Sequence, residues 1–417
     1  MRWPGATARV LIGLAAGALV GLSLAHWLPA TAGTAVAIAQ PLGKLWLSGL
    51  QMTVVPLVLS LVLLGVATAS DAAASGRVAR RAMVVFIALL SLFAAYAAIV
   101  APLVLSMVPP SEALTATLRG TLPAAGAVAA PGLADWIGSV VPSNAIMAAA
   151  QGAMLPVVVF ALFFGFALTR VQEDRRAQII GFCHGIADTM IVIVRWMLLA
   201  APIGVFALVL AVCAQAGIGV IGALAGYIAL QCGMYLGATL ICYVLVAVLA
   251  RQSPLAFAKA ILPAQVVAAS TQSSLASLPA MVESARFRLG HPRAVAALVL
   301  PMAVTLFRIT SPIQYIVAAC FVAWAYGIDV NAVTLAAGAA LAVVISLGSI
   351  GLPGQVSFMA TVMPVTQSMG LPIEPLGLLL AVDTIPDVFA TTGNVTGDLT
   401  APSIVARHNQ EATDPPS

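Results

Sequence analysis

Apolar stretches long enough to cross a bilayer alternate with short polar loops along the first 250 residues. A membrane-spanning helix needs about 20 mostly apolar residues, and the pattern predicts six such spans, at about 10–28, 42–69, 82–107, 141–170, 178–212 and 217–250. A weakly periodic stretch rich in Gly, Ala and Pro, 109–136, predicts an external loop. Arginines cluster in two other loops and near both ends. The positive-inside rule therefore places both termini in the cytoplasm.

The alternation changes after residue 253. Residues 254–290 and 331–370 each contain two apolar pieces that are too short to cross and that meet at a tip rich in Ser, Gly or Pro. Irregular backbone is not tolerated against lipid, so both tips must be buried in protein or line a cavity. A full span is predicted after each hairpin, at about 294–326 and 374–406. Paired broken segments indicate the binding site of a transporter, here built from two inverted repeats of hairpin plus helix.

The last predicted span carries a polar stripe on an otherwise apolar helix. Steps of four, four, three and four residues place on one face Asp383, Asp387, Thr391, Asn394 and Asp398. An ionisable side chain at the centre of a membrane helix costs about 2.5–3.5 kcal/mol unless it pairs or faces a cavity. The stripe therefore indicates a pathway for a solute or an ion. The alternative is a structural stripe, in which partners on neighbouring helices neutralise each carboxylate.

Composition agrees with a polytopic membrane protein. Hydrophobic residues make up 62% of the chain, charged residues 8%, and the mean hydropathy is +1.08, whereas soluble domains carry about 25% charged residues. The net charge of +4 comes from the short basic clusters and does not indicate a nucleic-acid partner. The five cysteines are scattered singly, without metal-ligand spacing. The basic and apolar N-terminal stretch is expected to be an uncleaved first span.

Six segments carry a resemblance to a known family. They are PLV near 56, VPSN…LP at 141–156, APIGVFAL at 201–208, TQSSLASLP at 271–279, SLGSIGLPG at 346–354 and D…D…T..NVTGDLT at 383–400. In this order the chain resembles the dicarboxylate/amino acid:cation symporters, the glutamate transporter family. The resemblance implies an all-α polytopic membrane protein with eight transmembrane helices and two re-entrant helical hairpins. It also implies a homotrimer in contact with membrane lipid, in which a transport domain moves against a fixed scaffold like an elevator.

The resemblance divides the chain into two functional parts. Residues 1–253 are expected to form mainly the scaffold and the trimer contacts, with the third span partly in the moving domain. The transport core is 254–408, consisting of hairpin 254–290, helix 294–326, hairpin 331–370 and helix 374–406. A disordered tail is expected at 409–417.

The resemblance also implies functional residues at matching positions. The substrate-binding set is Ser273, Ser274, Arg308, Ser311, Gly351, Leu352, Asp387, Thr391 and Asn394. The cation-binding set, expected to hold sodium, is Thr305, Ser346, Ser349, Asn394 and Asp398. The serines of the first tip have a separate physical logic, because hydroxyls and N–H groups at a helix N-terminus can bind a carboxylate. Their alternative role is to satisfy backbone groups at a buried turn. For Asp383, a structural role and a role in transport both stay open.

Several positions depart from the family pattern. The segment that is NMDGT in the family reads FRITS here, so the Asn and Asp that complete sodium sites are replaced by Phe307 and Ile309. Leu90 stands where another ligand, a Thr in the third span, is expected. Ala390 occupies the position of an arginine found in members that carry acidic substrates, and Gln272 replaces an arginine seen in the first hairpin of some members. At least one sodium site is therefore expected to be lost, together with the usual side-chain carboxylate clamp.

Arg308 is the new element of this segment. A guanidinium within an apolar span needs an anion, and Asp387, Asp398 or a substrate carboxylate are the expected partners. Three interpretations stay open: a tethered cation that replaces a sodium ion, a relocated clamp for a substrate carboxylate, or a structural ion pair. Coupling is expected to use fewer sodium ions than in the family, or a proton on a carboxylate such as Asp387.

The predicted function is a symporter that takes up an amino acid or a dicarboxylate across a bacterial inner membrane. No cofactor beyond the coupling ion, sodium or a proton, is expected. A channel and a sodium-independent facilitator or exchanger are the alternatives, because polar stripes and re-entrant loops also build selectivity filters. An enzyme is not expected, because the four histidines lie outside the hairpin tips and form no evident nucleophile and base arrangement.

Overall fold

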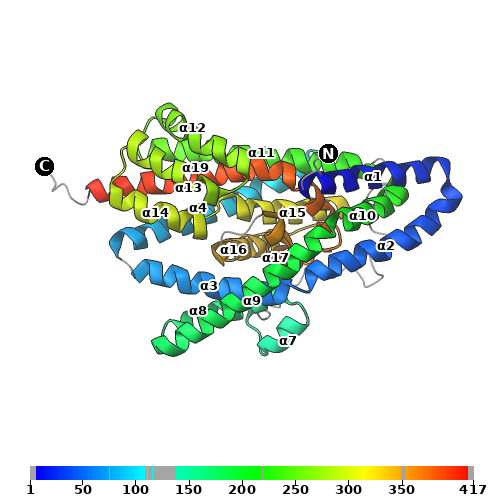
Figure 1. Ribbon diagram of the computed structural model, residues 1–417, viewed down its shortest axis with the longest axis horizontal. Coiled ribbons are helices and arrows are strands. Elements are labelled where there is room, and N and C mark those ends of the chain that lie inside the picture. Colours follow the sequence, from blue (N-terminus) through cyan, green and yellow to red (C-terminus); the bar gives the residue numbers. More distant parts are fainter. Residues whose placement is uncertain are drawn as a thin grey trace.

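The computed structural model describes residues 6–74, 76–108, 110, 115, 138, 140–217, 219–348 and 354–411. Within these residues every regular element is a helix. Seven described helices are long and apolar enough to cross a membrane, or up to eight if the bent pair α18 (Leu376–Val382) and α19 (Thr384–Glu411) counts as one span. The prediction of an all-α polytopic membrane protein is confirmed (Figure 1). The predicted external loop 109–136 lies almost wholly outside the described residues.

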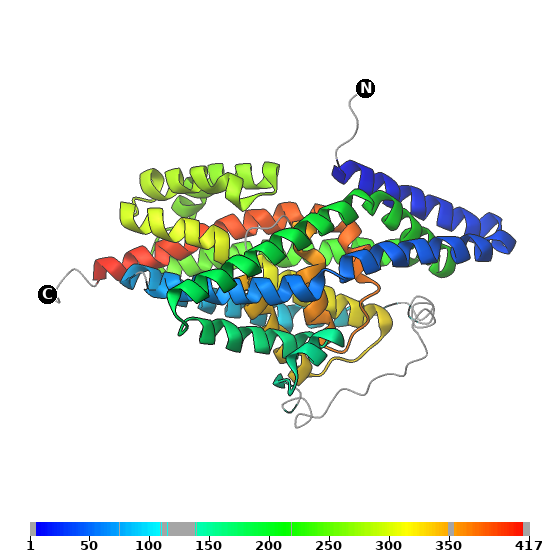
Figure 2. The ribbon, with the colours of Figure 1, turned by 60° about the horizontal axis from the view of Figure 1, so that its bottom comes forward.

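Three helices pack together at one end of the molecule (Figure 2): α1 (Ala6–Trp27), α2 (Pro29–Gln51) and α10 (Ala201–Ala216). Glycines at every fourth position of α1 face the backbone of α10. A Cβ atom added at Gly13 would lie 2.4 Å from the carbonyl oxygen of Pro202, and one at Gly17 would lie 2.6 Å from that of Phe206. Small residues let membrane helices approach closely in this way. The sequence of α1 therefore fixes its contact with α10.

Five further helices pack against one another outside this end of the molecule. The contacts join α3 (Val54–Ala74) to α8 (Met154–Leu168) and α9 (Glu173–Leu199), and α4 (Arg77–Ser106) to α15 (Thr310–Tyr326). The short helix α7 (Ala145–Ala150) precedes α8, and Asn144 caps it by accepting a hydrogen bond from the N–H of Met147 (3.0 Å). At the end of α3, Asp71 forms an ion pair with Arg176 of α9.

Two helical hairpins occupy the predicted positions, although α12 (Pro254–Thr271), predicted to be too short to cross, is one of the seven helices long and apolar enough to do so. The first consists of α12 (Pro254–Thr271) and α13 (Ser274–Glu283), which a π-helical turn, η1 (Ser284–Arg288), extends. The second consists of α16 (Ala332–Gly348) and α17 (Gly354–Ser368), and its tip, 349–353, lies outside the described residues. A broken helix follows each hairpin: α14 (Arg293–Leu306) with α15, and α18 with α19. The helix α11 (Gly219–Leu249) lies along α19, as do α12 and α14.

The structure corrects four predicted spans. The predicted span 141–170 is two helices, α7 and the 15-residue α8, which separate at 151–153. The predicted span 178–212 is two helices, α9 and α10, which separate at Ala200. The predicted span 42–69 is α3 plus the second half of α2, which begins at Pro29. The predicted span 374–406 is bent by 71° at Asp383, so this aspartate ends α18 and the other four stripe residues lie on α19.

Prolines explain both breaks in the repeated unit. Pro312 lies four residues after Arg308, and Pro386 lies four residues after Val382. A proline lacks the N–H that would bond to the fourth preceding carbonyl, and its ring clashes with that carbonyl. Phe307, just before the first break, is accordingly extended, with φ −131° and ψ 108°. The same local chemistry therefore interrupts the helix after each hairpin.

We expect Gly17→Leu to destabilise the protein, because the added side chain must push the backbone of α10 away from α1. Overpacking of this kind costs about 1–3 kcal/mol. The midpoint of thermal unfolding in detergent should fall. Gly33→Leu is the matched control on α2, since a Cβ atom there meets nothing within 4 Å. Equal losses in the two variants would contradict the close contact.

Candidate functional site

The polar stripe of α19 is enclosed by protein. Asp398 is fully buried, and Thr391 and Asn394 are nearly so, while Asp387, close to the start of the helix, is partly exposed. The Thr391 hydroxyl donates to the carbonyl oxygen of Asp387 (2.9 Å). The stripe therefore runs from a partly open end at Asp387 to a closed end at Asp398.

The break between α14 and α15 faces the middle of this stripe. The backbone N–H of Thr310, at the start of α15, donates to Asn394 Oδ1 (3.0 Å). The Thr310 hydroxyl donates to the carbonyl oxygen of Ala390 (3.4 Å). The first N–H groups of a helix have no partner within the helix, so Asn394 satisfies one of them from another helix. These bonds hold the two broken helices together.

Arg308 lies within the break, partly exposed, and its charge acts on both Asp387 and Asp398. Neither carboxylate oxygen of Asp398 hydrogen-bonds to a described residue, although the side chain is fully buried. A buried carboxylate needs a positive charge or a proton. Arg308 is the basic side chain whose charge reaches Asp398. The structure thus brings together the guanidinium and two of the carboxylates that the sequence singled out.

An aromatic pair fills the place where the family pattern implies a sodium site. Phe307 stacks on Phe86 of α4, with ring centroids 4.7 Å apart and planes 13° apart. Both rings are fully buried, as are Leu90 and Ile309. Ile309 also contacts Gly397, where an added Cβ atom would lie 2.9 Å from the isoleucine side chain. Apolar packing, not oxygen ligands, therefore occupies this region.

The first hairpin tip is attached to the α18–α19 break. Gln272 adopts the left-handed conformation with φ 51°, and its Nε2 donates to the carbonyl oxygen of Thr384 (3.1 Å). Ser273 caps α13 by accepting a hydrogen bond from the N–H of Ala276 (3.2 Å). Ser274 is buried beside it. The Ser273 hydroxyl thus has the local capping role, and the tip stands next to Asp383 and Asp387.

The other predicted binding residues that the structure describes form hydrogen bonds within their own helix or the adjoining break. Thr305 is exposed, and its hydroxyl donates to the carbonyl oxygen of Pro301 (3.0 Å). Ser346 is buried and donates to Ala342 (2.7 Å). Ser311 is partly buried, and its N–H donates to the carbonyl oxygen of Arg308 (3.1 Å). Three further predicted residues lie outside the described part of the chain: Ser349, Gly351 and Leu352.

The sequence interpretation missed polar groups around Asp383. Gln314 Nε2 of α15 donates to Asp383 Oδ1 (2.8 Å). Three buried side chains of α11 lie one helical turn apart on the same side: Tyr227, Gln231 and Tyr235. Polar residues at steps of four in an apolar span were the signal that could have indicated this face.

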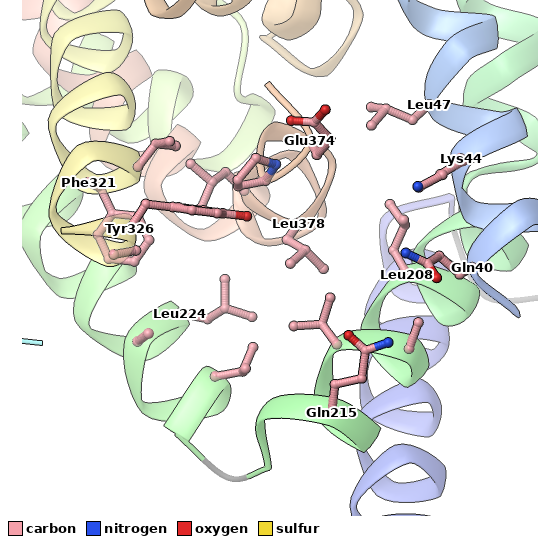
Figure 3. A pocket seen from close by; sticks show the side chains of 18 residues that line it. Gln40, Lys44, Leu47, Leu208, Gln215, Leu224, Phe321, Tyr326, Glu374 and Leu378 are labelled. Carbon is pink, nitrogen blue, oxygen red and sulfur yellow. The ribbon is translucent and has the colours of Figure 1, made fainter. Parts of the chain in front are cut away.

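A separate apolar cavity of about 110 Å³ lies between α2 and α10 on one side and α15 and α18 on the other (Figure 3). Its charged lining residues are Lys44 and Glu374. None of the residues predicted to bind substrate or cation lines it. Within the described residues, no three His, Cys, Asp or Glu side chains are placed to hold a metal ion together.

Comparison with known families decides the class of protein. The model of the sodium:dicarboxylate symporter family matches residues 6–408, nearly the whole chain. The chain belongs to this family. The resemblance found in the sequence is confirmed. Members of the sodium:dicarboxylate symporter family are transporters and not enzymes, so the prediction that this protein is not an enzyme is also confirmed.

Relatives within the family differ in what they carry. The proton/glutamate-aspartate symporter of Escherichia coli (strain K12) is 27% identical over 96% of this chain and 92% of its own length. The proton/sodium-glutamate symport protein of Bacillus subtilis (strain 168) is 25% identical over 97% and 92%. The C4-dicarboxylate transport protein of Rhizobium leguminosarum is 27% identical over 97% and 88%. These matches support a cation-coupled carboxylate symporter, and they span both amino acids and dicarboxylates.

We expect Arg308→Met to impair substrate binding and uptake strongly, although methionine is the usual residue of the family pattern here. Breaking a buried ionic interaction costs about 3–5 kcal/mol because the partner charge stays buried, and the charge of Arg308 acts on two carboxylates. Uptake into proteoliposomes and substrate-induced thermal stabilisation measure the effect. Arg293→Met, at an exposed arginine that begins α14, is the matched control. Normal binding and uptake by Arg308→Met would make Arg308 a bystander.

Proposed function

We propose that this protein takes up a small carboxylate-bearing solute, an amino acid or a dicarboxylate, across a bacterial inner membrane. One observation carries the proposal: an arginine and two aspartates lie together between two broken helices, and the first hairpin tip is attached beside them. In a transporter, such broken helices present backbone groups to an enclosed solute. Both termini are cytoplasmic in this proposal.

Substrate binding involves the partly exposed end of the stripe. Asp387 pairs with the α-amino group of an amino-acid substrate, and Thr391, Asn394 and the first hairpin tip supply further contacts. Asn394 Oδ1 already accepts from Thr310, so its amide NH2 is the group that remains for a substrate carboxylate. Ser274, with Gly351 and Leu352 of the second tip, completes the set.

Transport follows an elevator motion in a homotrimer. Residues 254–408 move as the transport core, and residues 1–253 mainly form the scaffold and the trimer contacts. The contacts of α4 and α11 with α19 support the assignment of part of the third span, and of α11 as well, to the moving side. The close contact of Gly13 and Gly17 of α1 with the backbone of α10 supports a rigid scaffold.

Coupling uses fewer sodium ions than three, or a proton. The stack of Phe86 and Phe307 replaces oxygen ligands, whereas Thr305, Ser346 and Ser349 keep oxygens for another cation. Near Asp398, Arg308 acts as a tethered positive charge in place of an ion. Arg308 also serves as a clamp for a substrate carboxylate. Its charge acts on Asp387, which places the guanidinium near the proposed substrate contact.

We expect Asp387→Asn to abolish uptake of amino-acid substrates while the trimer stays folded, because the amide cannot neutralise the substrate's ammonium group. Radiotracer uptake into proteoliposomes and size-exclusion chromatography measure the two properties. Asp329→Asn, at an exposed aspartate between α15 and α16, is the control and should transport normally. Wild-type uptake rates in Asp387→Asn would remove this residue from the site.

We expect charge movement per substrate to show fewer than three coupled sodium ions, because the described site has lost oxygen ligands to apolar packing. Reversal potentials measured in proteoliposomes at varied sodium concentration and pH give the stoichiometry. Saturable accumulation against a gradient supports a symporter. Uptake that never exceeds equilibrium would instead support a facilitator.

A further inference from the structure

A second buried polar cluster lies where α11 meets α15 and α18, one turn from the substrate site. It consists of Asp383, Gln314, Tyr227, Gln231 and Tyr235, and is called here the Asp383 cluster. Asp383 accepts from Gln314 Nε2 (2.8 Å), and Gln231 Nε2 donates to the Tyr235 hydroxyl (2.5 Å). The aspartate and the three residues of α11 are at most 1% exposed. These four side chains are therefore closed off from the surface of the molecule, whereas Gln314 is partly exposed.

Three polar atoms of this cluster make no hydrogen bond with any described residue: Asp383 Oδ2, Tyr227 Oη and Gln231 Oε1. Buried polar groups in folded proteins are hydrogen-bonded in the large majority, so three such atoms in one place need an explanation. The charge of Asp383 acts on both tyrosines. The aspartate and the α11 side chains therefore share one electrostatic environment. Gln231 Oε1 can only accept a hydrogen bond, and Asp383 Oδ2 can also only accept one as long as the carboxylate is ionised.

No cation within the described residues compensates Asp383. None of α10, α11, α15, α17 and α18 contains a lysine or an arginine. The helices α1 and α19 also contact α18 and carry Arg9 and Arg407, but neither arginine is among the groups whose charge acts on Asp383. Arg308 acts on Asp387 and Asp398, whereas the charged group that acts on Asp383 is Asp387, a second carboxylate. The other titratable groups around the cluster are Tyr227 and Tyr235 of α11, with Cys232 acting on Tyr227.

Burial of an ionised carboxylate without a cation is far more costly than burial of the neutral acid. A water molecule could satisfy the hydrogen bonds of the cluster, but it would not remove the charge. A proton on Asp383 Oδ2 does both, because it turns an acceptor into a donor for Gln231 Oε1 or the Tyr227 hydroxyl.

We propose that Asp383, in the pocket formed by Gln314, Tyr227, Gln231 and Tyr235, is the proton-binding site that couples transport to the proton gradient. The proposal rests on the proposed function and assigns its coupling proton to a residue outside the substrate contacts. The proton binds to one carboxylate oxygen and leaves it again on the other side of the membrane, and no other bond changes.

The position of Asp383 explains how proton and substrate would bind together. Asp387 follows one turn later, and its N–H donates to the carbonyl oxygen of Asp383 (3.0 Å). A substrate with net negative charge that binds beside Asp387 makes the neutral form of Asp383 more favourable. By linkage, the proton then raises the affinity for that substrate by the same factor. The hydrogen bond from Gln272 to Thr384 joins the first hairpin tip to the same turn. The proposed substrate is therefore an anion, such as an acidic amino acid or a dicarboxylate.

The test compares wild type with Asp383→Asn in proteoliposomes without a sodium gradient. With one coupled proton, each pH unit of inward gradient supports about tenfold accumulation of substrate, since one unit corresponds to about 1.4 kcal/mol. Wild type should accumulate an acidic amino acid or a dicarboxylate in this way. Asp383→Asn keeps the acceptor for Gln314 and should bind substrate in thermal-shift assays, but without accumulation and without pH dependence of binding.

Two further variants keep the test decisive. Asp383→Glu retains an ionisable group and should restore accumulation, with a shifted pH at half-maximal uptake. Tyr227→Phe removes one of the hydroxyls and should shift the same pH value. Should Asp383→Asn not fold, unchanged pH profiles in both of these variants would overturn the proposal.

The possible results separate this proposal from the proposed function. Accumulation by Asp383→Asn equal to that of wild type overturns the role of Asp383 and leaves the symporter intact. Accumulation by wild type that responds to sodium and not to pH also overturns the proton site alone. Absence of any carboxylate uptake by wild type overturns the proposed function itself.

Discussion

The neutralisation of buried charge is the constraint on which the rest of this structure depends. Three aspartates lie in the interior of a chain in which charged residues make up only 8%. An arginine from the facing helix break compensates two of them, Asp387 and Asp398. The third, Asp383, is surrounded by neutral amide and hydroxyl groups. Since unpaired charge is costly in an apolar interior, the arrangement of the surrounding helices depends on how each carboxylate is neutralised.

Interrupted helices make this arrangement possible. Proline four residues after a carbonyl breaks the helix at Arg308 and again near Val382, and each break releases backbone groups that need partners. One partner is Asn394, which accepts from Thr310, and another is Gln272, which donates to Thr384. The two breaks and the first hairpin tip are thus tied to one another by side chains. A movement of the tip would reach both broken helices directly.

The structure shows what occupies the segment in which the resemblance implies ligands for sodium. Phe307 and Ile309 are not passive replacements, because the phenylalanine stacks on Phe86 and the isoleucine packs against Gly397. Apolar burial offers no ligands for sodium, which requires oxygen donors. Near Asp398 the positive charge comes from Arg308, whose guanidinium acts on the buried carboxylate.

Much of the fold follows from the sequence alone, because hydrophobic length and helical period are local properties. They predicted the all-helical membrane fold, the two hairpins at 254–290 and 331–370, and the shared face of Asp387, Thr391, Asn394 and Asp398. Local pattern did not show that Asp383 stands at a 71° bend, or that Gln314 bonds to it from 69 residues away. Nor could it show Phe307 against Phe86, or Asn394 capping α15. Those contacts join residues far apart in the chain, so only the packing of whole helices decided which polar groups meet and which charges remain without a partner.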